Sequence, residues 1–277
     1  MNRLSRALVV AVLVTTAGQV CTEAHAQEPS DGPPTSHEEQ EAATERRVLS
    51  DIGAYFTAPL HWDARNWEFF GGALAAIAAS HEFDSRVRTD FIRGTSNSLN
   101  GSDTYDLQDA LPAAVLFTGT WLYSGLFDDT NGRTATGAMA EAGGLSVVTG
   151  YLLSYAAGRE RPDQTTDPNQ WRAGGSSFPS LHVTAAFAVG TVFAESGSEE
   201  YRWLTRLIGY GIAVATSYER LDHNAHWLSD VVAGAGLGAS SAVFVLNRTY
   251  GRESGAQIGL APLEGGGFLL SYRLTID

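Results

Sequence analysis

Lysine is absent from this chain of 277 residues, and cysteine occurs once, at Cys21. All 18 basic residues are therefore arginines; against 31 acidic residues they leave a formal net charge of −13. This acidic balance argues against a nucleic-acid partner and against general adhesion to anionic lipid, because both require positive charge. A single cysteine excludes disulfides within the chain and thiolate metal sites, so stability has to come from a packed core.

The first 26 residues have the pattern of a secretory signal peptide. Residues 1–6 include two arginines, residues 7–14 are apolar, and residues 24–26 read Ala-His-Ala. A positive start, a short apolar run and an A-x-A end are typical of a cleaved signal. We therefore expect cleavage after Ala26 and an exported protein, periplasmic or envelope-associated. An uncleaved N-terminal anchor is the alternative.

Three regions follow the predicted signal. Residues 27–50 are rich in Glu, Pro, Ser and Thr, which predicts a disordered acidic leader. Residues 51–250 are expected to form a helical domain. Residues 251–277 include apolar side chains that alternate from Phe268 to Ile276, which is the period of a strand. We expect a C-terminal β-hairpin made of 257–263 and 267–276.

Six segments of the helical domain are rich in Ala, Leu, Val and Gly. They lie at 67–81, 111–127, 136–157, 182–195, 202–218 and 229–246. Helices that are apolar on most faces lie inside a large bundle or in a membrane. Glu141 and Arg206 interrupt two of the segments, and a mean hydropathy of −0.09 is low for a protein with many spans. We favour a soluble or peripherally attached bundle, with an integral inner-membrane protein of six spans as the alternative.

One group of residues has side chains suited to catalysis: Arg220, His226 and Asp230. If a helix begins near Ala225, the imidazole of His226 and the carboxylate of Asp230 lie on one face. A carboxylate beside an imidazole fixes its tautomer and stabilises the cation that forms when the other nitrogen reacts. The planar guanidinium of Arg220 suits a phosphate group. The alternative is a His–Asp pair at a helix end with a structural role only.

A second cluster lies at Pro179, Ser180, Leu181 and His182. Proline and serine are typical of the start of a helix, and the apolar stretch after His182 continues it. Backbone N–H groups at a helix start bind anions, and the hydroxyl of Ser180 adds a further donor. His182 lies at the same point and could protonate a leaving alkoxide. An N-cap followed by a core histidine is the structural alternative.

These clusters, together with Arg161-Pro162, resemble the three motifs of the type 2 phosphatidic acid phosphatase superfamily. That superfamily includes bacterial acid phosphatases, lipid phosphatases and vanadate-dependent haloperoxidases. The chain departs from the family pattern in having Ser154 for the first-motif lysine, Leu181 for glycine and Glu219 for serine. Arg159 or Arg172 could replace the missing cation.

The resemblance implies an all-α, six-helix bundle of the acid phosphatase/vanadium haloperoxidase type over about 52–249, with the site at one end. It assigns His226 as the nucleophile, Asp230 as its orienting partner and His182 as the proton donor. It assigns phosphate binding to Arg161, Arg220, Ser180 and the backbone of Leu181. The implied reaction is metal-independent and cofactor-free hydrolysis of phosphate monoester or pyrophosphate bonds through a phosphohistidine. Because the helices are apolar, a lipid phosphate with possible membrane contact is favoured over a small soluble ester.

Three alternatives remain open. A zinc site at His223 and His226 is disfavoured, because no Glu follows in the H-E-x-x-H manner. A vanadate-dependent haloperoxidase would use the same pocket. A non-catalytic exported envelope or binding protein would explain the three departures from the family motifs.

Overall fold

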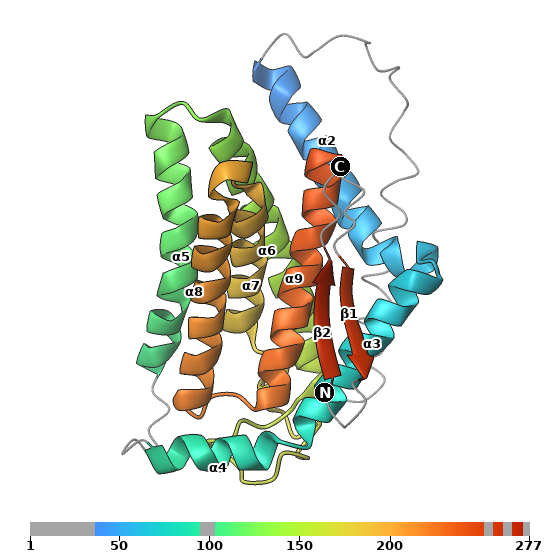
Figure 1. The fold of residues 1–277 in the computed structure, drawn as a ribbon, viewed down its shortest axis with the longest axis vertical. Coiled ribbons are helices and arrows are strands. Elements are labelled where there is room, and N and C mark those ends of the chain that lie inside the picture. The colour runs from blue at the N-terminus through green and yellow to red at the C-terminus, as the bar shows by residue number, and fades with distance from the viewer. Residues whose placement is uncertain (1–36, 95–102, 252–256, 263–267, 274–277) are drawn as a thin grey trace. The chain divides into compact units, whose positions relative to one another are not determined.

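The computed structural model describes residues 37–94, 103–251, 257–262 and 268–273. The predicted signal and the first part of the leader, 27–36, lie outside these residues. Eight α-helices are present in the described part of the chain (Figure 1). They are α2 (His37–Thr57), α3 (Ala64–His81), α4 (Asp84–Gly94), α5 (Asp103–Leu126), α6 (Thr130–Ala157), α7 (Leu181–Ser196), α8 (Arg202–Asp222) and α9 (Leu228–Tyr250).

Residues 1–60 and 61–277 form two separate compact units. The first unit contains α2, in which Arg47 Nε lies 3.6 Å from Asp51 Oδ2, one helical turn away. The predicted leader was expected to lack regular structure up to residue 50, whereas the chain is helical from His37 onward. The short 3₁₀ helix η1 (Ala58–His61) follows α2.

Each of the six predicted helical segments coincides with a helix, from α3 to α9 with α4 omitted. The fold is helical, as expected, but α2 and α4 were not predicted. Helix α4 reads DSRVRTDFIRG, and its apolar residues are Val87, Phe91 and Ile92. So short and mainly polar a segment is a weak helix signal in a sequence. The 3₁₀ helix η2 (Glu199–Tyr201) connects α7 to α8.

Helix α7 is the central helix of the second unit and contacts α5, α6, α8 and α9. Its side chains are mainly small and apolar, and Val183, Ala186 and Val192 are buried. The backbones of α7 and α8 approach very closely, because a Cβ added at Gly190 would lie 2.5 Å from the carbonyl oxygen of Gly209. Only glycine is compatible with such an approach, which fixes these two helices against each other.

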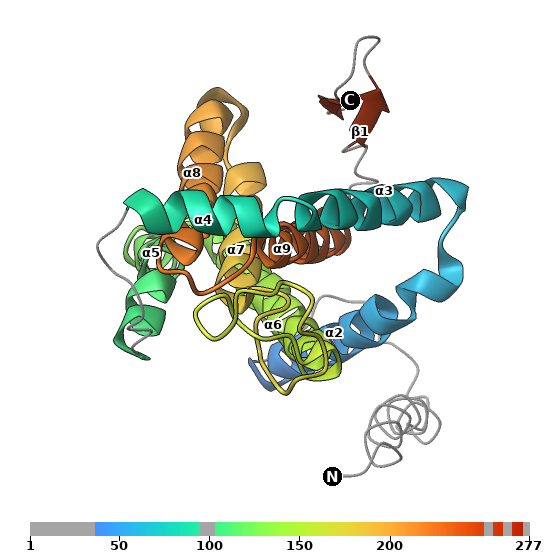
Figure 2. The same ribbon diagram turned by 90° about the horizontal axis from the view of Figure 1, so that it is seen from below.

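Consecutive helices α6 to α9 run in alternating directions, so four helix ends come together at one end of the second unit (Figures 1 and 2). These are the C-terminal ends of α6 and α8 and the N-terminal ends of α7 and α9. A backbone hydrogen bond joins two of them, since Ser180 N donates to Asp230 O at 3.1 Å. This end contains all three sequence motifs.

Two strands follow the helices. β1 (Gln257–Pro262) and β2 (Phe268–Arg273) pair antiparallel, with Gln257 opposite Arg273 and Pro262 opposite Phe268. The residues expected to form the connection between them, 264–266, lie outside the described residues.

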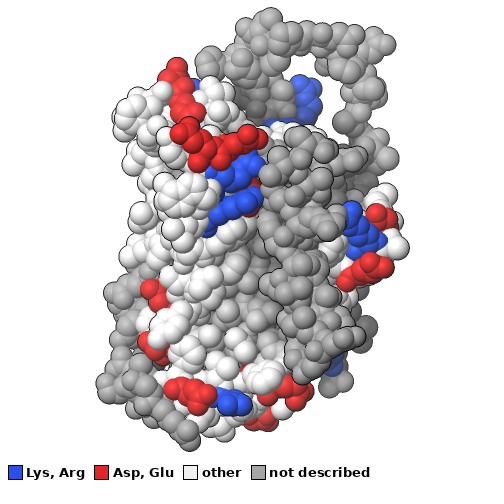
Figure 3. Space-filling model, viewed as in Figure 1, with Lys and Arg blue, Asp and Glu red and all other residues white. Residues whose placement is uncertain are grey.

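Large apolar side chains are exposed along several helices. The exposed set includes Trp121 and Leu122 of α5, Tyr151 of α6, and Trp203 and Leu207 of α8. On the face drawn in Figure 3, charged side chains gather towards the ends of the helices and uncharged ones lie between them. Helix α9 is long and apolar enough to cross a bilayer, with a mean hydropathy of 1.5 over its most apolar window, although half of that window is buried.

Candidate active site

His226 is held in a single orientation by a backbone carbonyl. Its side chain is buried, and its Nδ1 lies 2.7 Å from Ser177 O. A carbonyl oxygen only accepts, so Nδ1 bears the proton in this contact. In the neutral ring Nε2 then has the lone pair, and Nε2 is the nitrogen available for attack on an electrophile.

Asp230 supports this arrangement without bonding to the imidazole directly. Its Oδ2 lies 3.8 Å from His226 Nδ1, which is an ion-pair distance when the ring is protonated but too long for a hydrogen bond. The same oxygen accepts from Ser177 Oγ at 2.5 Å and from Trp227 N at 2.9 Å. Asp230 therefore holds the residue whose carbonyl orients the ring.

The predicted helical pairing of His226 and Asp230 needs a correction. Helix α9 begins at Leu228 and not near Ala225, so His226 precedes the helix. The reason is the capping contact in which the Asp230 carboxylate accepts from Trp227 N, which makes Trp227 the N-cap. The imidazole and the carboxylate are close because a cap brings them together, and not because they share a helix face.

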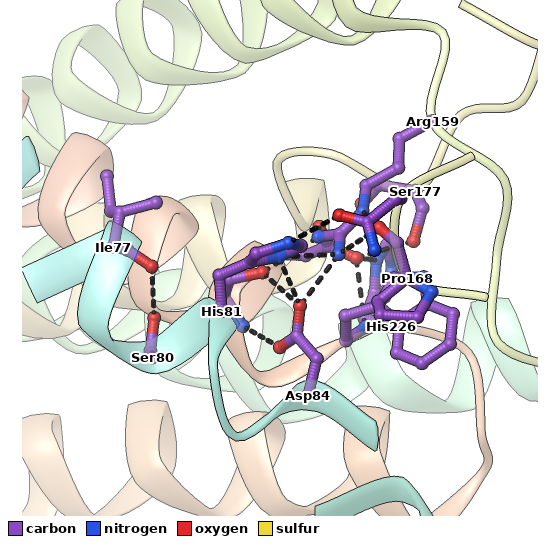
Figure 4. Close-up of polar contacts among 12 residues, drawn as sticks. Ile77, Ser80, His81, Asp84, Arg159, Pro168, Ser177 and His226 are labelled. Carbon is purple, nitrogen blue, oxygen red and sulfur yellow. Dashed lines mark hydrogen bonds and ion pairs between the residues drawn. The ribbon is translucent and has the colours of Figure 1, made fainter. Parts of the chain in front are cut away.

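Arg159 is fully buried between two carboxylates (Figure 4). Its Nη1 donates to Asp230 Oδ1 at 2.5 Å and its Nη2 to Asp84 Oδ2 at 2.7 Å. The carbonyl of Pro168 accepts from Nη2 as well, at 2.8 Å. The indole of Trp171 covers the guanidinium, with 4.4 Å between Arg159 Cζ and the ring centroid. These contacts occupy Arg159, so the geometry disfavours it as a substitute for the missing lysine.

The other candidate cation, Arg172, is exposed on the segment between α6 and α7 and has a left-handed backbone, with φ 58°. Ser154, which stands at the lysine position, is buried in α6 near its C-terminal end. Neither position places a charged group beside His226 in the way that the family lysine is expected to.

Arg220 and Arg161 are close enough to His226 to change the pKa of its imidazole electrostatically. Burial of the imidazole lowers the pKa of His226 to about 4. The positive charges of Arg220 and Arg161 also lower this pKa, while the negative charge of the nearby Asp230 carboxylate opposes the change. Arg220, from the end of α8, is fully buried, and Arg161 is partly buried. The first and third motifs therefore meet around one buried imidazole.

The start of α7 presents the second motif to the same region. Ser180 is the N-cap but makes no side-chain capping bond, and its buried hydroxyl has no hydrogen-bonding partner among the described residues. His182 lies in the first turn and is partly buried. Beside it is an apolar pocket of about 210 Å³, lined by Ala110, Ala113, Val147, Leu181, His182 and Ala185. A buried hydroxyl and a helix N-terminus suit an anion.

The side chain of Leu181 points towards α6. A Cβ added at Gly150 would lie 2.7 Å from Leu181 Cδ2 and 3.7 Å from Pro179 Cγ. Glycine at position 150 thus makes room for leucine at the position where the family has glycine. The substitution in the second motif is accommodated on the side of α6.

Replacing Gly150 by Ala is therefore expected to lower the melting temperature relative to Gly144→Ala, because the end of the Leu181 side chain has to shift, and to lower activity by displacing the start of α7. The second change Leu181→Ala should restore much of both, because it removes the clashing methyl group. Gly144→Ala is the matched control on α6, since a Cβ there meets no described atom within 4 Å. Thermal unfolding and turnover of the four proteins provide the measurement; equal melting temperatures for Gly150→Ala and Gly144→Ala would contradict the packing argument.

The pKa of His226 leads to a second prediction. The folded protein takes up this proton only near pH 4, whereas an unfolded chain takes it up near pH 6.5. Because the unfolded state binds more protons between these values, stability falls as the pH is lowered from about 6.5 to 4. The melting temperature of wild type should drop more steeply over this range than that of His226→Gln. Parallel curves would contradict the low pKa.

Several residues at the site were not predicted from sequence. Asp84 and His81 come from the junction of α3 and α4, and Ser177 and Ser229 come from the segments before α7 and in α9. Asp84 contacts Ser229, which is 145 positions further along the chain. No local pattern signals such a pair. No cluster of three or more His, Cys, Asp or Glu side chains suited to a metal occurs within the described ranges.

Residues 135–253 match the model of the PAP2 superfamily, and this range contains all three motifs. The family resemblance expected from the motifs is therefore confirmed. A lipid A 1-phosphatase of Porphyromonas gingivalis is 34% identical over 113 residues, which is 41% of this chain and 21% of that protein. The chain thus matches only about a fifth of the length of this curated relative. A transmembrane PAP2-type phosphatidylglycerolphosphate phosphatase from Bacillus subtilis aligns with a TM-score of 0.38 and 17% identity, over 76% of this chain and 96% of that one.

Proposed function

We propose that this protein is a lipid phosphatase that hydrolyses phosphate monoester or pyrophosphate bonds through a phosphohistidine at His226. The observation that supports this most directly is the buried, neutral imidazole of His226. Its Nδ1 is committed to Ser177 O, so Nε2 is the reactive atom. Two arginines act on the same ring. The superfamily match and the lipid A 1-phosphatase relative support the reaction class and a lipid phosphate substrate.

In the proposed first step Nε2 of His226 attacks phosphorus in line with the leaving oxygen. The P–O bond to the alcohol breaks, and His182 gives its proton to that oxygen. Arg161, Arg220, the Ser180 hydroxyl and the backbone N–H groups at the start of α7 stabilise the charge on the phosphoryl oxygens. In the second step water attacks phosphorus with His182 as base, which releases phosphate and restores His226.

A lipid substrate is supported by the apolar surroundings of the proton donor. The pocket beside His182 is lined mainly by alanine and other aliphatic side chains, and it would accept the apolar part of an alcohol leaving group. A small soluble ester would gain little from such a lining.

We also propose that the helical unit of this protein lies in the membrane, which was the alternative to a soluble bundle. Exposed side chains such as Trp121, Leu122, Trp203 and Leu207 would be costly in water, and α9 is a candidate span. Washing of membranes from expressing cells with high salt and then with detergent tests this. Release by detergent alone supports insertion, and release by salt contradicts it.

The reaction is tested by phosphate release from phosphatidate in detergent, followed by quenching of a ³²P-labelled reaction. An acid-labile, alkali-stable label on wild type, absent from His226→Ala, supports the phosphohistidine. Turnover without a label on histidine would contradict the mechanism but not the activity. If wild type and His226→Ala release phosphate equally slowly, the phosphatase proposal is wrong.

A further inference from the structure

A buried chain of charges connects the candidate site to α4, which lies outside the matched superfamily region. Asp84, Arg159 and Asp230 are all fully buried. Arg159 lies between the two carboxylates, 2.7 Å from Asp84 Oδ2 and 2.5 Å from Asp230 Oδ1. Asp84 is at the first position of α4 and precedes residue 135, where the family match begins.

Asp84 also holds the start of α9. Its Oδ1 accepts from Ser229 N at 2.8 Å and its Oδ2 from Ser229 Oγ at 2.7 Å. Ser229 directly precedes Asp230 in the chain. One carboxylate therefore contacts the backbone beside Asp230 and the guanidinium that binds Asp230.

His81 contacts both Asp84 and Arg159. Its Nδ1 lies 2.8 Å from Asp84 Oδ2 and 3.1 Å from Arg159 Nη2 (Figure 4). Its Nε2 lies 3.0 Å from Asn169 Oδ1. Asp84 thus has partners on α3, on α9 and on Arg159, and its carboxylate is fully engaged. An engagement this complete fixes the carboxylate in position and, through it, Arg159.

We propose that Asp84 is a positioning residue for the His226 site, acting through Arg159 and Ser229 to fix Asp230 and the charge behind the imidazole. This inference rests on the proposed phosphatase function and extends it to a residue outside the three motifs. Asp84 touches neither the substrate nor the reacting atoms. It fixes the position of Asp230, which holds Ser177 against His226. It also contributes to the net charge of the buried cluster of Asp84, Arg159 and Asp230.

The charges give the proposal a directional test. The groups that act on His226 are Asp230, Arg220 and Arg161, with Arg159 and Asp84 behind Asp230. The set of Asp84, Arg159 and Asp230 has a net charge of −1. Arg159→Gln makes it −2, Asp84→Asn makes it zero, and the double variant returns it to −1. In a buried site such changes act strongly on a neighbouring imidazole.

We expect Asp84→Asn, which keeps the shape of the side chain, to lower kcat on phosphatidate by about 100-fold, as small misplacements of reacting groups do. Arg159→Gln should lower kcat at least as much. It should also move the acidic limb of the kcat/KM–pH profile to higher pH, because loss of the positive charge favours the protonated imidazole. The double variant should bring this limb back towards the wild-type position and be more active than Arg159→Gln alone.

Asp90→Asn is the matched control, because it makes the same change at an exposed position of the same helix; it should leave kcat and the pH limb unchanged. If Asp84→Asn lowers the melting temperature but retains wild-type kcat, Asp84 contributes to stability only and the proposal is wrong. The proposal is also wrong if the double variant keeps the shifted limb of Arg159→Gln. Absence of turnover in wild type, relative to His226→Ala, would instead reject the phosphatase function itself.

Discussion

Replacing His226 by Ala is expected to lower the turnover of every phosphate ester by about 10⁴-fold or more, the scale seen when a catalytic nucleophile or its base is removed. The imidazole is buried close to Arg220 and Arg161, and one of its nitrogens is already committed to a backbone carbonyl. Water attacking directly would lack this orientation. The expected loss is therefore in kcat, with little change in KM, because the phosphate-binding groups remain.

His223→Ala is the matched control for this experiment. It removes a histidine three positions earlier in the chain, at the end of α8, that the proposed mechanism does not use. Phosphate release from phosphatidate and from p-nitrophenyl phosphate should be close to wild type in this variant. Equal losses in the two variants would indicate that local structure, and not the nucleophile, had been measured.

Replacing His182 by Ala is expected to have an effect that depends on the leaving group. General acid catalysis contributes about 10²–10⁴-fold, and an alkoxide leaving from phosphatidate needs the proton that His182 would supply. p-Nitrophenolate is a weak base and leaves without one. The first turnover of p-nitrophenyl phosphate should therefore stay near the wild-type rate while phosphatidate cleavage falls by the full amount.

His182→Ala is also expected to change the second step, the hydrolysis of the phosphohistidine. Without His182 as base, hydrolysis of the phosphohistidine slows, so p-nitrophenolate should appear in a burst and labelled enzyme should accumulate. His182→Asn, which retains a polar side chain without a titratable nitrogen, should behave in the same way. Equal losses on both substrates, with no burst, would show that His182 is needed for binding or folding and not for proton transfer.

The helices of the second unit could be predicted because their apolar runs are long and their ends are marked. Ser180 before α7 and Gly158 after α6 are typical of a helix start and a helix end, and both are caps in the structure. Helix α4 was not predicted, because a short segment with few apolar side chains gives a weak signal in a sequence. Its Phe91 packs against Tyr218 of α8, and Asp84 at its first position is the residue that contacts the site.

The site was predicted only as far as its motifs extend. Their spacing, together with the family resemblance, indicated that His226, Asp230 and Arg220 belong together. The role of Ser177 O in orienting the ring could not be foreseen, since a backbone carbonyl contact leaves no trace in residue types. Arg159 was one of two possible substitutes for the missing cation, with Arg172 as the other. The contact with Asp84, 75 residues earlier, and that with Asp230 show that Arg159 lies between two carboxylates.

The near-contact of the α7 and α8 backbones at Gly190 and Gly209 bears on how the site is held together. Two helices that touch main chain to main chain cannot slide or spread apart without losing that fit. This contact fixes the separation of the two helices, and with it the placement of Ser180 and His182 at the start of α7 relative to Arg220 at the end of α8.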